Sequence, residues 1–194
     1  MFSMEFEEII YMRRTIRRFR QDPISLEKLR KLIDFARVAP MARNIQGLEF
    51  IIVYNAEMKK KLFPLVNWAQ SLPEDQRTPE KGREPTAYII VLVNTKIKNA
   101  YVDFDVGAAV ENILLGAVNF GIGSCWMGSI NREKIRKLLE IPDHYDIKHV
   151  ISLGYPDENS VIEPYKDSFN YWKDNNGQMH VPKRTLNSII FKIF

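Results

Sequence analysis

The sequence predicts a single globular domain that mixes α-helices with buried β-strands. Its 194 residues are enough to bury a core without disulfides or a structural metal. With 45% hydrophobic and 27% charged residues, the composition is that of an ordinary folded protein and not of a disordered segment. Two apolar, β-branched runs, EFIIVY at 49–54 and AYIIVLVN at 87–94, indicate strands that are buried in the core.

Helical periodicity surrounds these strands. Ser3 is expected to cap a short first helix, and Ser25 a second one that ends before Pro40. Asn55 is expected to cap a third helix, whose apolar positions continue as far as Ala69. These caps place helices both before and after the first strand.

The second half of the chain continues the alternation. Residues 101–121 form a long helix that is apolar on most sides, which is typical of a central helix, and Gly121 supplies its end. GSCWMG at 123–128 follows as a short strand and turn. An amphipathic helix over 131–140 and a strand over 147–153 complete the pattern.

Two segments lack such periodicity. Residues 71–85 contain three prolines and form a long loop, which we expect to act as a lid over a substrate site. Residues 156–194 are polar and aromatic and end in the apolar run IIFKIF. Because this tail cannot bury its apolar side chains against itself, we expect it to be an arm that wraps the domain or lies on another subunit. The whole chain, 1–194, is expected to be one domain.

Charge and cysteine content narrow the functional classes. The net charge of +4 permits anion binding but is weaker than the basic bias of many nucleic-acid-binding modules. A single cysteine, Cys125, gives no disulfide framework and is expected to be a small buried residue. The N-terminus is acidic, unlike a signal peptide, and no apolar run reaches the length of a membrane span. We therefore expect a cytoplasmic protein without a membrane partner.

The most unusual local feature is MRRTIRRFRQDP at 12–23. In a helix, Arg13, Arg17 and Arg20 would share one face and repel one another unless an anion were bound. Guanidinium groups bind phosphate in a bidentate manner, and the Thr15 hydroxyl could complete such a site. A solvated basic face that pairs with the nearby glutamates, or a nucleic-acid surface, explains the same residues, so spacing alone leaves these alternatives open.

Other motifs are less informative. The chain contains no GxGxxG and no GxxxxGK[ST], so a nucleotide would have to bind by another scheme. Asn44 and Gln46, between a helix end and a strand, could pair with the edge of a heterocycle, although turn chemistry explains Asn44 equally well. The three histidines lack metal-ligand spacing, and no metal site is expected.

Taken together and in order, several segments resemble the FMN-dependent nitroreductases. RRTIRRF resembles the RRSIRxF opening of that family, and AP-MARNIQGLEFIIV resembles its AP-SAxNxQPxxFxVV segment. DVGAAVENILLGAVNFGIGSCW resembles the central helix and the strand after it, usually DxGxAxQNxxLAAxxxGLGxxW. ISLGYP matches a late strand, and VPKRTLNSII resembles the closing basic motif. The matches cover nearly the whole chain.

This resemblance implies an α+β fold, a three-layer α-β-α sandwich around a central mixed β-sheet, and a homodimer with FMN sites at its interface. It also implies a set of FMN-binding residues. The opening motif would hold the phosphate, the ribityl chain and the ring edge of FMN. The 41–46 segment would lie near the ring, and the backbone of the 126–128 turn would lie near N5. The fourth group is the basic pair of the closing motif. The residues in these four groups are Arg13, Arg14, Thr15 and Arg17; Met41, Ala42, Asn44 and Gln46; Trp126, Met127 and Gly128; and Lys183 and Arg184. Arg18 and Arg20 are left as surface charge.

The implied activity is that of an FMN-dependent oxidoreductase. NADH or NADPH would give hydride to flavin N5, and a nitroaromatic, quinone or similar acceptor would then receive it, in a ping-pong mechanism without a catalytic side chain. Met41 replaces the usual serine, Gly47 the usual proline and Glu111 the common glutamine, so substrate preference is open. The alternatives are a flavin-binding protein with a storage, sensing, flavin-fragmenting or dehalogenating role, and a basic nucleic-acid-binding module.

Overall fold

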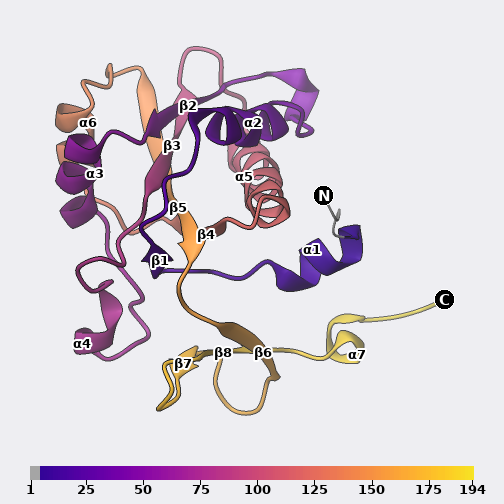
Figure 1. Ribbon diagram of the computed structural model, residues 1–194. Coiled ribbons are helices and arrows are strands. Elements are labelled where there is room, and N and C mark those ends of the chain that lie inside the picture. Colours follow the sequence, from indigo (N-terminus) through magenta and orange to yellow (C-terminus); the bar gives the residue numbers. More distant parts are fainter. Residues whose placement is uncertain (1–4) are drawn as a thin grey trace.

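The computed structural model describes residues 5–194, and its centre is a five-stranded sheet between two layers of helices (Figure 1). The strand order is β1-β5-β3-β2, and β4 also pairs with β5. Pairing between these strands is antiparallel, and a bridge between Thr15 and Ser124 adds a parallel contact. The strands are β1 (Phe19–Arg20), β2 (Leu48–Val53), β3 (Ala87–Asn94), β4 (Gly123–Met127) and β5 (Tyr145–Pro156).

The core lies on both faces of this sheet. Because side chains alternate along a strand, Ile89 and Val91 of β3 face α2 (Leu26–Arg37) and α5 (Val102–Asn119), whereas Ile90 faces the other layer. That layer contains α3 (Ala56–Leu62) and α6 (Arg132–Leu138), which lie across the sheet from α2 and α5 in Figure 1. The predicted three-layer α+β fold is therefore confirmed.

Local signals account for most helix ends. The Ser25 hydroxyl accepts a hydrogen bond from the Lys28 amide at 3.3 Å, and the Asn55 side chain caps α3 in the same way. Gly121, with φ of 68°, follows the end of α5, where a left-handed residue is favourable. Helix α1 spans Phe6–Met12 and begins with a capping box between Glu5 and Glu8. Ser3, predicted to be its cap, lies outside the described residues.

The third helix is shorter than predicted. Its apolar pattern continues to Ala69, but α3 ends at Leu62 and a 3₁₀ turn, Phe63–Leu65, follows. Pro64 lacks the amide that a continuing helix needs. Val66 is extended and forms an antiparallel bridge to Ile130, so its side chain reaches the core from a loop.

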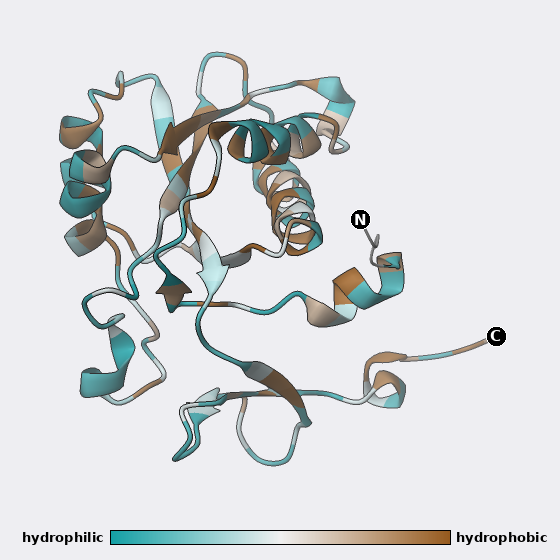
Figure 2. Ribbon diagram, viewed as in Figure 1, coloured by the Kyte–Doolittle hydropathy of each residue, from teal (hydrophilic) through white to brown (hydrophobic). Residues whose placement is uncertain are grey.

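The C-terminal segment forms strands that the sequence did not predict. β6 (Ser160–Pro164), β8 (Met179–Lys183) and β7 (Trp172–Lys173) form a separate three-stranded sheet, and α7 (Leu186–Ile189) follows. In Figure 1 this sheet lies below the main layers and the chain end extends away from them. Figure 2 shows that this end is hydrophobic, and Phe191 and Phe194 are fully exposed. The arm's contact with a second subunit stays a prediction.

Two further expectations concern individual segments. Cys125 is buried as predicted, and burial raises the pKa of its thiol. The loop at 71–85 contains a short helix, α4 (Glu74–Arg77), that the sequence did not indicate. Within residues 5–194, no helix combines the length and the hydrophobicity that a membrane span requires.

Candidate functional site

The arginine run is extended and not helical. After α1, residues 13–18 lie beside the start of β4, where the Ile16 amide donates to the Ser124 carbonyl oxygen at 2.9 Å. Side chains in extended backbone alternate between two sides. Arg17 and Arg18 consequently enter different surroundings, and the helical face considered for Arg13, Arg17 and Arg20 is not formed.

The run lines a small cavity of about 140 Å³, which we call the basic socket. The opening and closing basic motifs, far apart in the sequence, meet here. A tyrosine from the segment before β7 and a valine of β8 complete the wall. The lining residues are Arg13, Arg14, Thr15, Arg17, Tyr171, Val181 and Lys183. The structure thus brings together the four predicted residues of the opening motif and Lys183.

The socket carries a concentration of positive charge. Burial lowers the pKa of Arg14, and the adjacent charge of Arg13 lowers it further. The Arg17 guanidinium lies 4.6 Å from the centre of the Tyr171 ring, a cation–π distance. Arg13 Nε is 3.7 Å from a carboxylate oxygen of the half-exposed Glu111 on α5. An anion in the socket would relieve the repulsion among these cations.

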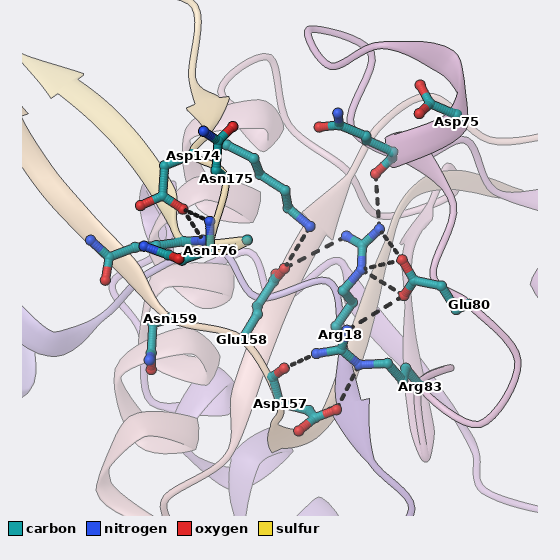
Figure 3. A pocket seen from close by; sticks show the side chains of 14 residues that line it. Arg18, Asp75, Glu80, Arg83, Asp157, Glu158, Asn159, Asp174, Asn175 and Asn176 are labelled. Atoms are coloured by element: carbon teal, nitrogen blue, oxygen red, sulfur yellow. Dashed lines mark hydrogen bonds and ion pairs between the residues drawn. The ribbon is translucent and has the colours of Figure 1, made fainter.

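Arg18, on the other side of the run, was predicted to be surface charge, and this is wrong. Its side chain is 2% exposed. Its Nε atom donates to Glu80 at 2.7 Å and its Nη2 atom to the Gln76 carbonyl oxygen at 2.9 Å, so it attaches the 71–85 loop to the body (Figure 3). The side chain of Arg20 is 56% exposed and pairs with Asp22, as expected of surface charge.

The 41–46 segment lies in a different part of the fold from the basic socket. Met41, Ala42, Asn44 and Gln46 surround a 3₁₀ turn, Ala42–Asn44, after α2. The Ala42 amide donates to the buried Asp105 carboxylate of α5 at 2.8 Å. In Figure 1 this segment is at the top of the molecule, above α5, whereas the chain between α1 and β1 passes below α5 and β4. Within one chain, therefore, the predicted ring-contacting amides and the basic socket do not meet.

The turn at 126–128 is closer to the socket in the fold, since it ends the strand that begins beside Thr15. Trp126 is 39% exposed, and its ring meets His149 edge-on at 5.2 Å between centroids. Met127 is buried, and the Gly128 carbonyl oxygen accepts a bond from Arg132 at 3.2 Å. Burial lowers the pKa of His149, as does the nearby Arg132. Sequence reasoning gave His149 no role, because a lone histidine in a strand carries no distinctive signal.

Arg184 does not line the socket. Its Nε atom donates to the Ser188 hydroxyl at 3.2 Å in α7, and its side chain is exposed. Tyr171, by contrast, belongs to the socket although sequence reasoning did not select it. The strand pairing of β7 with β8 carries its segment there, and nothing in the local sequence indicates that pairing.

Comparison with known proteins gives one matching family. The model described as the nitroreductase family matches residues 10–155. A protein from Archaeoglobus fulgidus, provisionally named NADH dehydrogenase/NAD(P)H nitroreductase, is 36% identical over 170 residues. That match covers 84% of this chain and 92% of the relative.

Solved structures agree with this result. A protein from Parabacteroides distasonis with the same provisional name is 29% identical, with a TM-score of 0.66 and coverage of 84% of this chain and 92% of that one. A structure named FMN-dependent nitroreductase, from Clostridium difficile, is 25% identical with a TM-score of 0.64. It covers 82% of this chain, and 91% of its own chain is matched.

Proposed function

Because the chain belongs to the nitroreductase family, we propose that it is an FMN-dependent oxidoreductase that uses NADH or NADPH. Its acceptor is a nitroaromatic, a quinone or a similar compound, reduced in a ping-pong cycle. The names of the Archaeoglobus and Clostridium relatives support the cofactor and the reductant. The single observation in this chain that supports the proposal best is the basic socket.

The socket fits the phosphate of FMN in its chemistry. Four cationic side chains and a hydroxyl surround a space of about 140 Å³, where burial and, after it, the charge of Arg13 lower the pKa of Arg14. A dianionic phosphate would satisfy guanidinium donors in a bidentate manner and remove the repulsion between Arg13 and Arg14. Surface lysines or a solvated basic face would not converge on one cavity in this way.

In this proposal Arg13, Arg14, Thr15 and Lys183 hold the phosphate, and Arg17 adds positive charge beside it. The backbone at 126–128 lies against the ring. When bound, FMN supplies the hydride chemistry, so no side chain acts as a catalytic acid or base. The protein's residues bind and orient the cofactor and set the charge around it.

Met41, Ala42, Asn44 and Gln46 enter the proposal through a second copy of the chain. They lie apart from the socket within one chain, and the apolar C-terminal residues are exposed. A homodimer in which this segment of the partner faces the socket would complete the site and cover the tail. Arg184 then stays near the socket's rim, at the end of β8, without lining it.

A second candidate function is flavin binding without reductase turnover, as in storage, sensing, flavin fragmentation or dehalogenation. Met41 favours it, because a thioether replaces the hydroxyl that the family usually has at this position. A nucleic-acid-binding role is less well supported. Arg18 is buried, and Arg13, Arg14 and Arg17 converge on a small cavity, so the run does not form an open basic stripe.

The test is a visible spectrum of the purified protein before and after NADH or NADPH under anaerobic conditions. We expect a yellow protein that the nicotinamide bleaches and that an added nitroaromatic or quinone restores. A yellow protein that is not bleached favours the second candidate, and a colourless protein that takes up no FMN contradicts both. Arg17→Ala should weaken FMN binding, with the exposed Arg20→Ala as the matched control that leaves binding unchanged.

A further inference from the structure

A buried carboxylate contacts the arginine run that lines the basic socket. Glu158, in the turn between β5 and β6, has a side chain that is only 3% exposed. It lies between the arginine run and a polar cavity of about 510 Å³ that Figure 3 shows from close by. Such a charge is stable in the interior only when cations and hydrogen-bond donors surround it.

Glu158 has three positive or donating neighbours. Its Oε1 atom accepts a hydrogen bond from the Arg17 backbone amide at 2.6 Å. Its Oε2 atom lies 3.6 Å from Arg18 Nη1 and 3.5 Å from Lys173 Nζ. Burial lowers the pKa of Lys173, and the Glu158 carboxylate opposes that shift.

These contacts reach two parts of the socket lining. Arg17 lines the socket, and Glu158 holds its backbone. Tyr171, two residues before Lys173, also lines the socket, and the Arg17 guanidinium stacks on its ring at 4.6 Å. One carboxylate thus links the Arg17 backbone to β7, the strand that follows Tyr171.

We propose that Glu158 is a positioning residue that fixes Arg17 and the segment of Tyr171 relative to each other in the socket lining and thereby confers the preference for a phosphorylated flavin. It does not touch the ligand, because it does not line the socket and borders a different cavity. The inference rests on the proposed function, since it concerns the phosphate-binding end of the same site.

A positioning role and a merely structural role make different predictions. If Glu158 only stabilises the fold, its loss should weaken every flavin equally. If it sets the socket, its loss should weaken FMN and spare riboflavin, which lacks the phosphate. The quantity to measure is therefore the ratio of the riboflavin and FMN dissociation constants, determined by quenching of flavin fluorescence on the full-length protein.

Glu158→Gln keeps an acceptor for the Arg17 amide but removes the charge that Lys173 and Arg18 face. We expect the ratio to fall about tenfold in this variant. Asp157→Asn is the matched control, because it removes a neighbouring carboxylate that is 42% exposed and pairs with Arg83, outside the socket. Its ratio should equal that of the unchanged protein. An equal loss of FMN and riboflavin binding in Glu158→Gln would overturn the proposal.

Lys173→Met provides a second route in case Glu158→Gln does not fold. It breaks only the link to β7, so we expect a smaller fall of the ratio in the same direction; no fall would contradict the link. In a double-mutant cycle, the effects of Glu158→Gln and Lys173→Met on the ratio should not be additive. Wild-type protein that fails to bind FMN would overturn the proposed function as well, whereas FMN binding with an unchanged ratio in both variants would overturn the positioning role alone.

Discussion

Arg18→Met is the most direct test of the buried charge network. The side chain of Arg18 is 2% exposed, and it contacts Glu80, the Gln76 carbonyl oxygen and Glu158. Methionine keeps an unbranched apolar stem in place of the arginine stem but is shorter and carries no charge, so it removes the guanidinium. The buried carboxylate of Glu158 then keeps only Lys173 as a compensating cation.

The expected loss in the free energy of unfolding follows from how exposed the partners of Arg18 are. Removing one member of a buried ion pair costs about 3–5 kcal/mol, because the other charge is left uncompensated. The side chain of Glu80 is 55% exposed and can return to water, and Lys173 still faces Glu158, so the lower end applies. We expect a loss of about 3 kcal/mol, which for a domain of this size lowers the Tm by about 6–12 °C.

The assay is thermal and urea unfolding at matched protein concentration, because association would make the Tm depend on concentration. Arg20→Met is the control: its side chain is 56% exposed and pairs with Asp22, so the expected loss is about 0–1 kcal/mol. Limited proteolysis should also cut Arg18→Met within 71–85 faster than the unchanged protein. Equal unfolding curves for the two variants would refute the reasoning.

Two further predictions concern β5 and the C-terminal sheet. Gly154→Ala would place a Cβ atom 2.7 Å from the fully buried Phe19 ring. We expect urea unfolding to show a loss of stability of about 1–3 kcal/mol from this overpacking. If adding Phe19→Leu to Gly154→Ala restored none of that stability, the clash with Phe19 would not be the cause. Burial opposes the charge on His180, but Glu163 and Asp174 raise its pKa overall. The stability from protonated His180 is thus fully present below its unfolded pKa of about 6.5 and is lost as the pH rises through the higher folded value. His180→Gln should therefore destabilise the protein more at pH 6 than at pH 9, and an equal loss at both would contradict this.

The sequence predicted the main layers well because their signals are local. Ser25 and Asn55 cap helices through their own side chains, and the apolar run at 87–94 is β3 to the residue. Strands and helices that alternate with clear periodicity need no knowledge of distant contacts. The exception, α3, ended early because a single proline outweighed an apolar pattern.

The site was predictable only in part, because long-range pairing decides it. The opening motif and Lys183 meet in the socket as the resemblance implied, whereas Tyr171 and Glu158 gain their roles from the C-terminal sheet and the turn before it. Arg17 and Arg18 are adjacent in sequence and identical in chemistry. They differ in role because the backbone beside β4 is extended and directs the two side chains to different sides. Arg17 therefore lines the socket, whereas Arg18 is a buried structural residue.

The position of β5 also dictates when the protein can fold during synthesis. This strand lies between β3 on one edge and β1 and β4 on the other, yet it is the last of the five to be made. A nascent chain that stops before residue 145 has β1 and β4 without a partner and an unpaired, apolar edge on β3, which is a target for aggregation or for chaperones. A chain that stops after residue 156 contains every strand of the main sheet. The main sheet can therefore form only once residues 145–156 are available to pair with β1, β3 and β4.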